Sequence, residues 1–275
     1  MNEKLSTKLL LIIFIIGLSL LLYPSVSDYW NSFTQSRAIA TYAEQVAELD
    51  NETYQKLLKE AKHYNKVLRK KANRFNPTEE EHEEYYKMLN VSGNGIIGYI
   101  EIDIIDCKLP IYHGTDDAIL QIAVGHIEGT SLPVGGKGTH AVISGHRGLP
   151  SARLFTDLDQ LVEGDTFVIR VLDEILTYEV DQILIVDPAD VQSLEIVPGE
   201  DYLTLVTCTP YGVNTHRLLV RGHRIDNLKN YNNIRVTADA LQIEPSIVAS
   251  FIAIPILIIL FIILLIKTRK KKEED

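Results

Sequence analysis

A cysteine at the end of a predicted strand is the residue of this sequence best placed to do covalent chemistry. Residues 202–207 (YLTLVT) alternate in hydrophobicity with a period of two, which predicts a half-buried strand that ends at Cys208. The loop TPYGVN supplies turn residues, and HRLLVRG then resumes as a second strand that carries Arg217. Two adjacent strands joined by this loop would hold Cys208 and Arg217 near one rim of a sheet.

The chemistry open to Cys208 depends on the charge around its sulfur. A cysteine attacks as a thiolate, and an unperturbed pKa of about 8.5 leaves little thiolate at neutral pH, so a nearby cation such as Arg217 or a histidine would activate it. The alternative is that Cys208 is a small apolar core residue and Arg217 a solvated charge on a strand, because free cysteines are often buried.

A general acid or base would have to come from the histidines. The eight histidines are His63, His82, His113, His126, His140, His146, His216 and His223. His146 ends the alternating segment AVISG and precedes Arg147 and Gly148, so it would lie at a strand tip beside an exposed loop, where sites are commonly built. We therefore rank His146 first. The histidines expected to be structural include His113, His126, His140 and His216.

The second cysteine, Cys107, has an environment typical of a core residue. Its neighbours in IDIIDCKLPIY alternate as in a buried strand. A disulfide between Cys107 and Cys208 is conceivable outside the cytoplasm, but it would consume the proposed nucleophile. The sequence has no CxxC, HExxH or EF-hand pattern, so we expect neither a metal site nor another cofactor.

The segments around Cys208 and His146 resemble a known family. TLVTC followed by TPYGVNTHRLLVRG resembles the active-site signature of sortases, in which a TLxTC strand carries the nucleophile and an arginine follows on the next strand. Upstream, THAVISGHRGLPSARLFTDLDQLVEGD resembles the segment with the family's catalytic histidine, which here is His146. With GYIEIDIIDCKLPIYHGT and GHIEGTSLPVGG, the likeness covers about Gly98 to Arg224 and points to class C, the pilus-assembling sortases of Gram-positive bacteria.

The resemblance implies a membrane-anchored cysteine transpeptidase that cleaves a sorting signal of the LPxTG kind. Cys208 would attack the threonine carbonyl, His146 would protonate the departing glycine amine, and Arg217 would hold the substrate backbone and the developing oxyanion. A lysine amine of a neighbouring pilin would then resolve the thioester as an isopeptide bond. The implied partners are pilin subunits that carry the signal and an acceptor lysine, together with the membrane.

Other functions remain as alternatives. The serious one is the housekeeping sortase role, in which surface proteins are anchored to peptidoglycan. A papain-like protease would place its cysteine before its histidine and on a helix. An L,D-transpeptidase would place histidine, glycine and cysteine almost adjacent, and SGHRG has no cysteine. A non-catalytic surface scaffold would keep its role after Cys208→Ala.

One segment departs from the class C pattern. Class C sortases commonly carry an Asp-Pro-aromatic lid before the barrel, whose carboxylate pairs with the catalytic arginine and whose ring covers the cysteine. The corresponding stretch here is RFNPTEEE, with Phe75, Asn76, Pro77 and Thr78. Asn76 has no charge to offer Arg217, Thr78 has no ring for Cys208, and Phe75 lies on the wrong side of the proline. We therefore expect this lid segment to shield the site only weakly.

The remaining sequence indicates how these residues are positioned. The chain has 275 residues, 46% of them hydrophobic, and a net charge of -10, without the basic stripe of a nucleic-acid surface, so no nucleic-acid partner is expected. After residue 95, short segments rich in Ile, Val, Tyr and Thr alternate with turn residues, and seven or eight such strands favour a closed barrel or sandwich. The resemblance implies the mainly-β sortase barrel. Residues 32–89 show helical spacing and predict two or three amphipathic helices, broken near residues 73–77, with Thr78 as a possible N-cap.

Both ends of the chain carry apolar runs. Lys4 and Lys8 precede the run 9–23, which at about 15 residues is short for a span that needs roughly 20. Residues 25–27 could form a cleavage site, so a signal peptide and a retained signal anchor both remain open. Residues 247–266 are long enough to cross a bilayer, and the basic KTRKKK after them places the C-terminus inside and the barrel outside the cell.

These observations predict six parts. They are a signal peptide or anchor (1–27), a helical extension with the lid segment (28–92), the catalytic barrel (93–226), a polar tether (227–246), a transmembrane helix (247–266) and a basic cytoplasmic tail (267–275).

Overall fold

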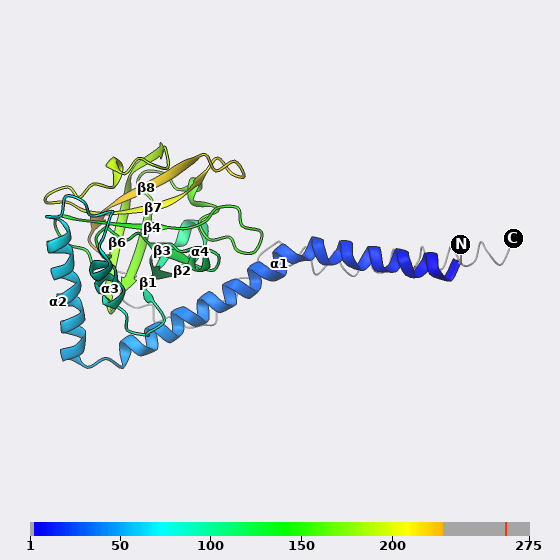
Figure 1. Cartoon of the computed structure of the whole chain (residues 1–275), viewed down its shortest axis with the longest axis horizontal. Coiled ribbons are helices and arrows are strands. Elements are labelled where there is room, and N and C mark those ends of the chain that lie inside the picture. Colours follow the sequence, from blue (N-terminus) through cyan, green and yellow to red (C-terminus); the bar gives the residue numbers. More distant parts are fainter. Residues whose placement is uncertain (1–2, 228–261, 263–275) are drawn as a thin grey trace.

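The fold is a closed β-barrel with helices packed on its outside (Figure 1). The structure, a computed structural model, describes residues 3–227 and residue 262. Eight strands close in the order β1-β2-β3-β4-β7-β8-β6-β5. Their bounds are Ile96–Ile102 (β1), Cys107–His113 (β2), Val124–His126 (β3), Thr139–Ser144 (β4), Thr166–Val171 (β5), Glu174–Val186 (β6), Asp201–Thr209 (β7) and His216–Ile225 (β8). The mainly-β barrel expected from the sequence is confirmed.

Seven of these strands coincide with the alternating segments of the sequence, and the eighth, β3, does not. It has only three residues, all buried, which is too short for a period of two to be recognised. It nevertheless closes the barrel, because it pairs in parallel with β2 and antiparallel with β4. The tether, the transmembrane run and the tail lie outside the described residues apart from Asn227 and Ile262.

Three helices precede the barrel, as the helical spacing predicted. They are α1 (Glu3–Ala47), α2 (Asn51–Leu68) and α3 (Glu79–Lys87). Thr78 caps α3 in a reciprocal capping box, in which its hydroxyl accepts from the amide of Glu81 and its own amide donates to the Glu81 carboxylate. The remaining helical turns are α4 (Asp117–Leu120), η1 (Asp103–Ile105), η2 (Leu158–Gln160) and η3 (Gln192–Leu194).

The first helix is longer than its apolar run suggested. It passes through Pro24 without ending and continues to Ala47, so the boundary expected after residue 27 falls inside α1. Proline removes one backbone donor from a helix, and a helix tolerates this where the freed carbonyl finds another partner. Among the described residues, α1 is the one helix long and apolar enough to cross a membrane by length and composition, in the stretch that starts at Leu11.

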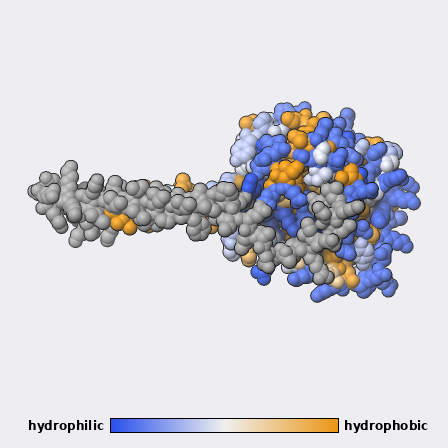
Figure 2. Space-filling view, turned by 180° about the vertical axis from the view of Figure 1, so that it is seen from behind, coloured by the Kyte–Doolittle hydropathy of each residue, from blue (hydrophilic) through white to orange (hydrophobic). Residues whose placement is uncertain are grey.

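The core fills the barrel and extends to the inner sides of α1 and α2. Inside the barrel, inward-facing residues such as Ile100, Ile169 and Leu205 are fully buried. The face of the domain seen in Figure 2 is mainly hydrophilic and is interrupted by apolar patches. The apolar interior therefore holds the strands in register, which the active site requires.

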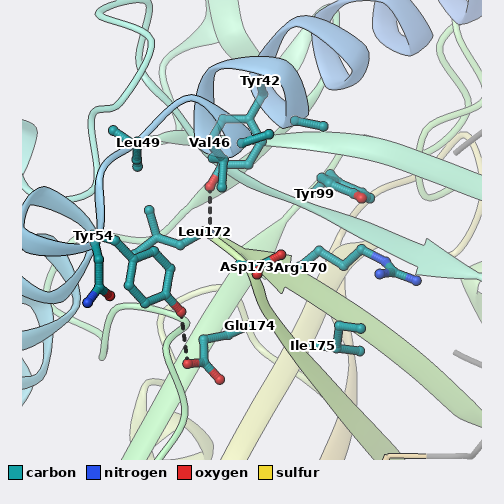
Figure 3. Close-up of a pocket in the computed structure, with 13 residues that line it drawn as sticks. Tyr42, Val46, Leu49, Tyr54, Tyr99, Arg170, Leu172, Asp173, Glu174 and Ile175 are labelled. Carbon is teal, nitrogen blue, oxygen red and sulfur yellow. Dashed lines mark hydrogen bonds between the residues drawn. The ribbon is translucent and has the colours of Figure 1, made fainter. Parts of the chain in front are cut away.

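Two tyrosines attach the helices to the turn between β5 and β6 (Figure 3). The buried hydroxyl of Tyr42 accepts a hydrogen bond from the amide of Leu172 at 2.8 Å and donates to the carbonyl of Ile97 at 3.1 Å. Tyr54 at the start of α2 contacts the Glu174 carboxylate at 3.0 Å. Between them lies an open cavity of about 610 Å³. These contacts fix the C-terminal end of α1 on one end of the barrel.

We predict that Tyr42→Phe destabilises the protein by about 1–3 kcal/mol, because it leaves a buried amide and a buried carbonyl without a partner. The matched control is Tyr54→Phe, whose half-exposed partner can turn to water, and which should cost about 1 kcal/mol or less. Urea unfolding of both variants measures the difference. A larger loss from Tyr54→Phe would contradict this account of how α1 is held.

Candidate active site

The register of three adjacent strands brings the predicted catalytic residues to one rim. Strand β4 runs parallel to β7 and pairs Ser144 with Val206, so His146, two residues past Ser144, is level with Cys208. On the other side of β7, antiparallel β8 pairs Arg217 directly with Cys208. Because neighbouring strands lie about 4.8 Å apart, His146 and Arg217 flank Cys208 at about that backbone spacing. We call this end of the barrel the catalytic rim.

Hydrogen bonds of Gly145, the residue after β4, keep the chain next to β7 beyond the end of the strand. The amide of Gly145 donates to the carbonyl of Val206 at 3.0 Å, and the hydroxyl of Thr207 donates to the carbonyl of Gly145 at 2.8 Å. A Cβ at position 145 would lie 2.7 Å from the ring of Phe155, so a larger residue would push the chain away. Sequence reasoning did not identify Gly145 and Thr207, although both lie within the motifs that it quoted.

The Cys208 side chain lies on the outer face of the barrel, because successive residues of a strand alternate between faces. Leu205 and Thr207 face the interior, whereas Val206 and Cys208 face outward. An apolar cluster covers this outer face below the catalytic rim. Its members are Val142, Leu194, Val206 and Leu219, with Phe75, Ile127, Leu184 and Val186 partly buried against them.

The two cysteines have opposite environments and do not form a disulfide. Cys208 is half-buried at the catalytic rim. Cys107 is buried in the core with its sulfur 3.9 Å from the carbonyl of Leu154, and burial raises the pKa of its thiol to about 12. The expectation that Cys107 is a core residue is confirmed.

The two arginines on the outer face of β8 differ in their partners. Arg221 makes a bidentate pair with Asp181, at 3.0 and 2.9 Å, and its guanidinium lies 4.2 Å from the ring centroid of Tyr202. Arg217 donates only to backbone carbonyls, those of His216 at 3.1 Å and Asn214 at 3.4 Å, and within residues 3–227 it has no carboxylate partner. Arg217, whose backbone pairs with that of Cys208, thus carries a charge that no carboxylate within residues 3–227 neutralises.

Two of the other histidines, His140 and His126, are buried and hydrogen-bonded. His140 is buried between the carbonyl of Glu195 and the hydroxyl of Thr204, and burial lowers the pKa of its imidazole to about 4. Burial has the same effect on the pKa of His126, which contacts the carbonyl of Ser131. Both are structural, as expected. His146 stays half-buried, with only its backbone carbonyl fixed, by the amide of Phe155.

Two loops meet above the catalytic rim. Tyr211, in the loop between β7 and β8, lies 5.8 Å from the guanidinium of Arg147, which also pairs with Asp159. A Cβ on Gly148 would lie 2.9 Å from the Tyr211 ring, and its φ of +75° is one that glycine adopts without strain. The loop after His146 therefore packs closely against the loop after Cys208.

The lid segment contacts the outer face of the barrel through Arg74 and Phe75, which precede the three residues that align with the Asp-Pro-aromatic motif. Phe75 packs on the apolar cluster, and the guanidinium of buried Arg74 lies 4.6 Å from its ring centroid. Arg74 also donates to the carbonyl of Leu194 and pairs with Glu195. Asn76, by contrast, is exposed. Thr78 is exposed as well and serves as the cap of α3, whereas Pro77, between Asn76 and Thr78, is half-buried.

Within residues 3–227 no group of three or more His, Cys, Asp or Glu side chains is arranged to hold a metal ion.

Comparisons with known proteins agree with this geometry. The chain matches the Sortase domain family over residues 100–225. The crystal structure of sortase C1 from Streptococcus agalactiae is 52% identical, with a TM-score of 0.68 over 70% of this chain and 100% of that one. Sortase C of Streptococcus pneumoniae is 45% identical, with a TM-score of 0.62 over 70% and 97%. The chain belongs to the sortase family of cysteine transpeptidases, and its structural neighbours group it with class C.

A more distant relative covers less of the chain. Sortase A of Streptococcus agalactiae is 32% identical over 117 residues, which are 42% of this chain and 47% of that protein. The chain thus spans about half the length of that curated relative.

We predict that Arg217→Lys lowers kcat/KM for peptide cleavage by roughly 100-fold, because lysine keeps the charge but loses the planar fork that can hold an oxyanion and a backbone carbonyl together. Arg221→Lys is the matched control on the same strand and face, and should keep most of the activity because Arg221 is already paired with Asp181. Steady-state kinetics on both variants test the assignment. An active Arg217→Lys with an inactive Arg221→Lys would reverse it.

We also predict that Phe75→Ala accelerates alkylation of Cys208 only slightly, because the Cys208 side chain is already half-exposed while Phe75 occupies the apolar cluster. Deleting the whole segment would also remove the buried Arg74 anchor, so a single substitution is the cleaner change. Phe75→Leu, which keeps an apolar side chain there, is the control. A large acceleration in Phe75→Ala but not in Phe75→Leu would show that this ring forms an effective lid.

Proposed function

We propose that the chain is a membrane-anchored transpeptidase that cleaves an LPxTG-like sorting signal and joins pilin subunits by isopeptide bonds. The observation that supports the proposal is the strand register, in which β8 pairs Arg217 with Cys208 and parallel β4 ends two residues before His146, at Ser144 beside Val206. Acyl transfer through a thioester requires a nucleophile, a group that donates and accepts a proton, and a permanently charged donor for the oxyanion, all close together.

Each residue has one role in the proposed reaction. The Cys208 thiolate adds to the carbonyl carbon of the signal's threonine, and the oxygen that becomes negative is held by the Arg217 guanidinium. Arg217 now donates to two backbone carbonyls and would turn from them to the substrate. His146 gives a proton to the glycine amine as the peptide bond breaks. It then accepts a proton from the lysine amine that attacks the thioester and regenerates Cys208.

The apolar cluster beside the catalytic rim supports a signal with apolar residues before its threonine. Val206 and Leu219 lie two residues along their strands from Cys208 and Arg217, on the same face. A leucine and a proline of the signal would pack there as the threonine carbonyl reaches the sulfur. Phe75 now lies on this cluster, so the peptide and this ring would compete for it.

Pilin joining is preferred over attachment to peptidoglycan for two reasons. The two solved structures compared above are sortase C enzymes, and the Streptococcus pneumoniae enzyme is described in terms of its pilin substrate specificity. The helical extension with its lid segment is also the part expected of class C. Peptidoglycan anchoring is the alternative, and the two differ in the amine that resolves the thioester.

The proposed setting is the outer face of the cell membrane. The apolar run 247–266 and the basic residues after it support a C-terminal span with the tail inside. The barrel (93–226) would then stand outside the cell on the polar tether 227–246, and the helical extension 28–92 would cover part of its surface.

The experiment is to incubate the full chain in nanodiscs with an LPxTG-type peptide and search by mass spectrometry for a thioester. The intermediate should form on Cys208 and should be absent in Cys208→Ala. Cys107→Ala should keep most of the cleavage activity. Equal loss in both variants would contradict the assignment of the nucleophile.

The resolving amine is tested by offering two acceptors to the acylated enzyme. A lysine-containing pilin domain should be joined through its side chain, whereas an amine-bearing peptidoglycan stem peptide should be a poor acceptor. The reverse preference would favour the anchoring role and leave the thioester chemistry intact.

A further inference from the structure

The part of α1 that follows its apolar run exposes large aromatic side chains. Tyr29, Trp30 and Phe33 are 51%, 67% and 55% exposed, and no other element of the described structure covers them. We call these three residues the aromatic collar. Tyrosine and tryptophan are enriched where a membrane-spanning helix passes through the lipid headgroups.

The length of the preceding helix fits this position of the collar. From residue 9 to residue 27 the sequence has no charged side chain, and these 19 helical positions rise about 28 Å, close to the hydrocarbon thickness of a bilayer. The apolar run looked short because it was taken to stop before Pro24, whereas the helix continues. The first charge after it is Asp28, directly before the collar.

The same segment of α1 is attached to the barrel by polar contacts on its other side. Asp28 accepts a hydrogen bond from the amide of Arg153 at 2.8 Å. Asn31 donates to the carbonyl of Ser151 at 2.8 Å, and Gln35 donates to the carbonyl of Ile122 at 2.6 Å. The collar therefore has a fixed position relative to the loop that contains residues 151–153.

That loop belongs to the catalytic rim. Ser151 follows His146 by five residues, so the two backbones are at most about 18 Å apart. The other end of α1 is attached to the opposite end of the barrel, through Tyr42 and Leu172. Strand β6 connects the two ends, since Val186 pairs with Arg217 while Glu174 begins the strand at the far turn. Thirteen residues separate the ends by up to about 40 Å.

We propose that α1 is retained as a membrane anchor, that the aromatic collar lies among the lipid headgroups, and that the catalytic rim faces the bilayer while the turn between β5 and β6 points away. Figure 1 shows the N-terminal half of α1 leaving the barrel as a straight extension. Since α1 is one continuous helix bonded to the domain at both rims, the anchor sets orientation as well as attachment.

This orientation limits the substrates that the site can take. A peptide whose reactive bond emerges within about 20 Å of the bilayer surface can reach Cys208, because the loop at Ser151 is bonded to the helix turn that carries the collar. Peptides from soluble proteins would have to enter the space between the rim and the membrane. The inference depends on the proposed function only in identifying this rim as catalytic.

The test measures energy transfer to lipid headgroups from the full chain in nanodiscs. A thiol-reactive donor is attached to Cys208, and the comparison is the same donor at Asp173→Cys in a Cys208→Ala background. Asp173 is exposed at the far turn, and buried Cys107 stays unlabelled in both. Because the two ends lie up to about 40 Å apart, transfer from Cys208 should be several times more efficient than transfer from position 173. Equal transfer, or more from position 173, would overturn the orientation whether or not the enzyme is active.

The collar has its own readout, because Trp30 is the single tryptophan of the chain. In nanodiscs its fluorescence should be quenched by lipids brominated near the glycerol and should be protected from acrylamide. Trp30→Phe supplies the background. If acrylamide quenches the Trp30 fluorescence and brominated lipid does not, the collar lies in water and its proposed role is refuted.

Discussion

The structure depends on the pairing of the chain at Gly145 with strand β7. Strand β4 ends at Ser144, yet the amide and carbonyl of Gly145 continue the contact through Val206 and Thr207. This continuation sets the height of His146 on the barrel relative to Cys208, and the hydrogen bond from the amide of Phe155 to the carbonyl of His146 holds the chain just beyond it. The absence of a side chain at position 145 allows Phe155 to close over it. A one-residue slip between β4 and β7 would turn His146 to the opposite face from the thiol.

The outer face of β7 and β8 divides its polar groups between structure and chemistry. The charges of Arg221 and Asp181 compensate each other, and the ring of Tyr202 lies against the Arg221 guanidinium. Arg221 therefore has a structural partner. Arg217, at the other end of the strand, has only carbonyl partners in the described part of the chain. Strand pairing places Arg217 opposite half-buried Cys208, so the mechanism that we propose assigns its unused donors to the oxyanion. Between the two arginines, Leu219 and Val206 provide an apolar surface on which a peptide side chain can pack.

The sequence predicted seven of the eight strands, and the neighbouring positions of Cys208 and Arg217, because these features have local signals. YLTLVTC shows the alternation of a strand, and the turn residues after it bring Arg217 back beside Cys208. Helix α3 was predicted from Thr78 and the acidic residues that follow, which is again local capping chemistry. What could not be predicted depends on tertiary contact. Strand β3 is too short to show a period, Arg74 becomes an anchor only because Leu194 is brought next to it, and the passage of α1 through Pro24 depends on its surroundings.

The most direct measurement of the central claim is a crystal structure of the chain modified by a peptide whose scissile amide is replaced by a chloromethyl ketone, which alkylates a thiolate with loss of chloride. The account predicts a bond from Cys208 Sγ to the ketone's methylene carbon, Arg217 turned from the carbonyls of Asn214 and His216 to the ketone oxygen, and the His146 imidazole on the leaving-group side. It also predicts that the residues before the threonine displace Phe75 from Val206 and Leu219. An adduct whose oxygen is held by other groups, with Arg217 still bonded to those two carbonyls, would contradict it.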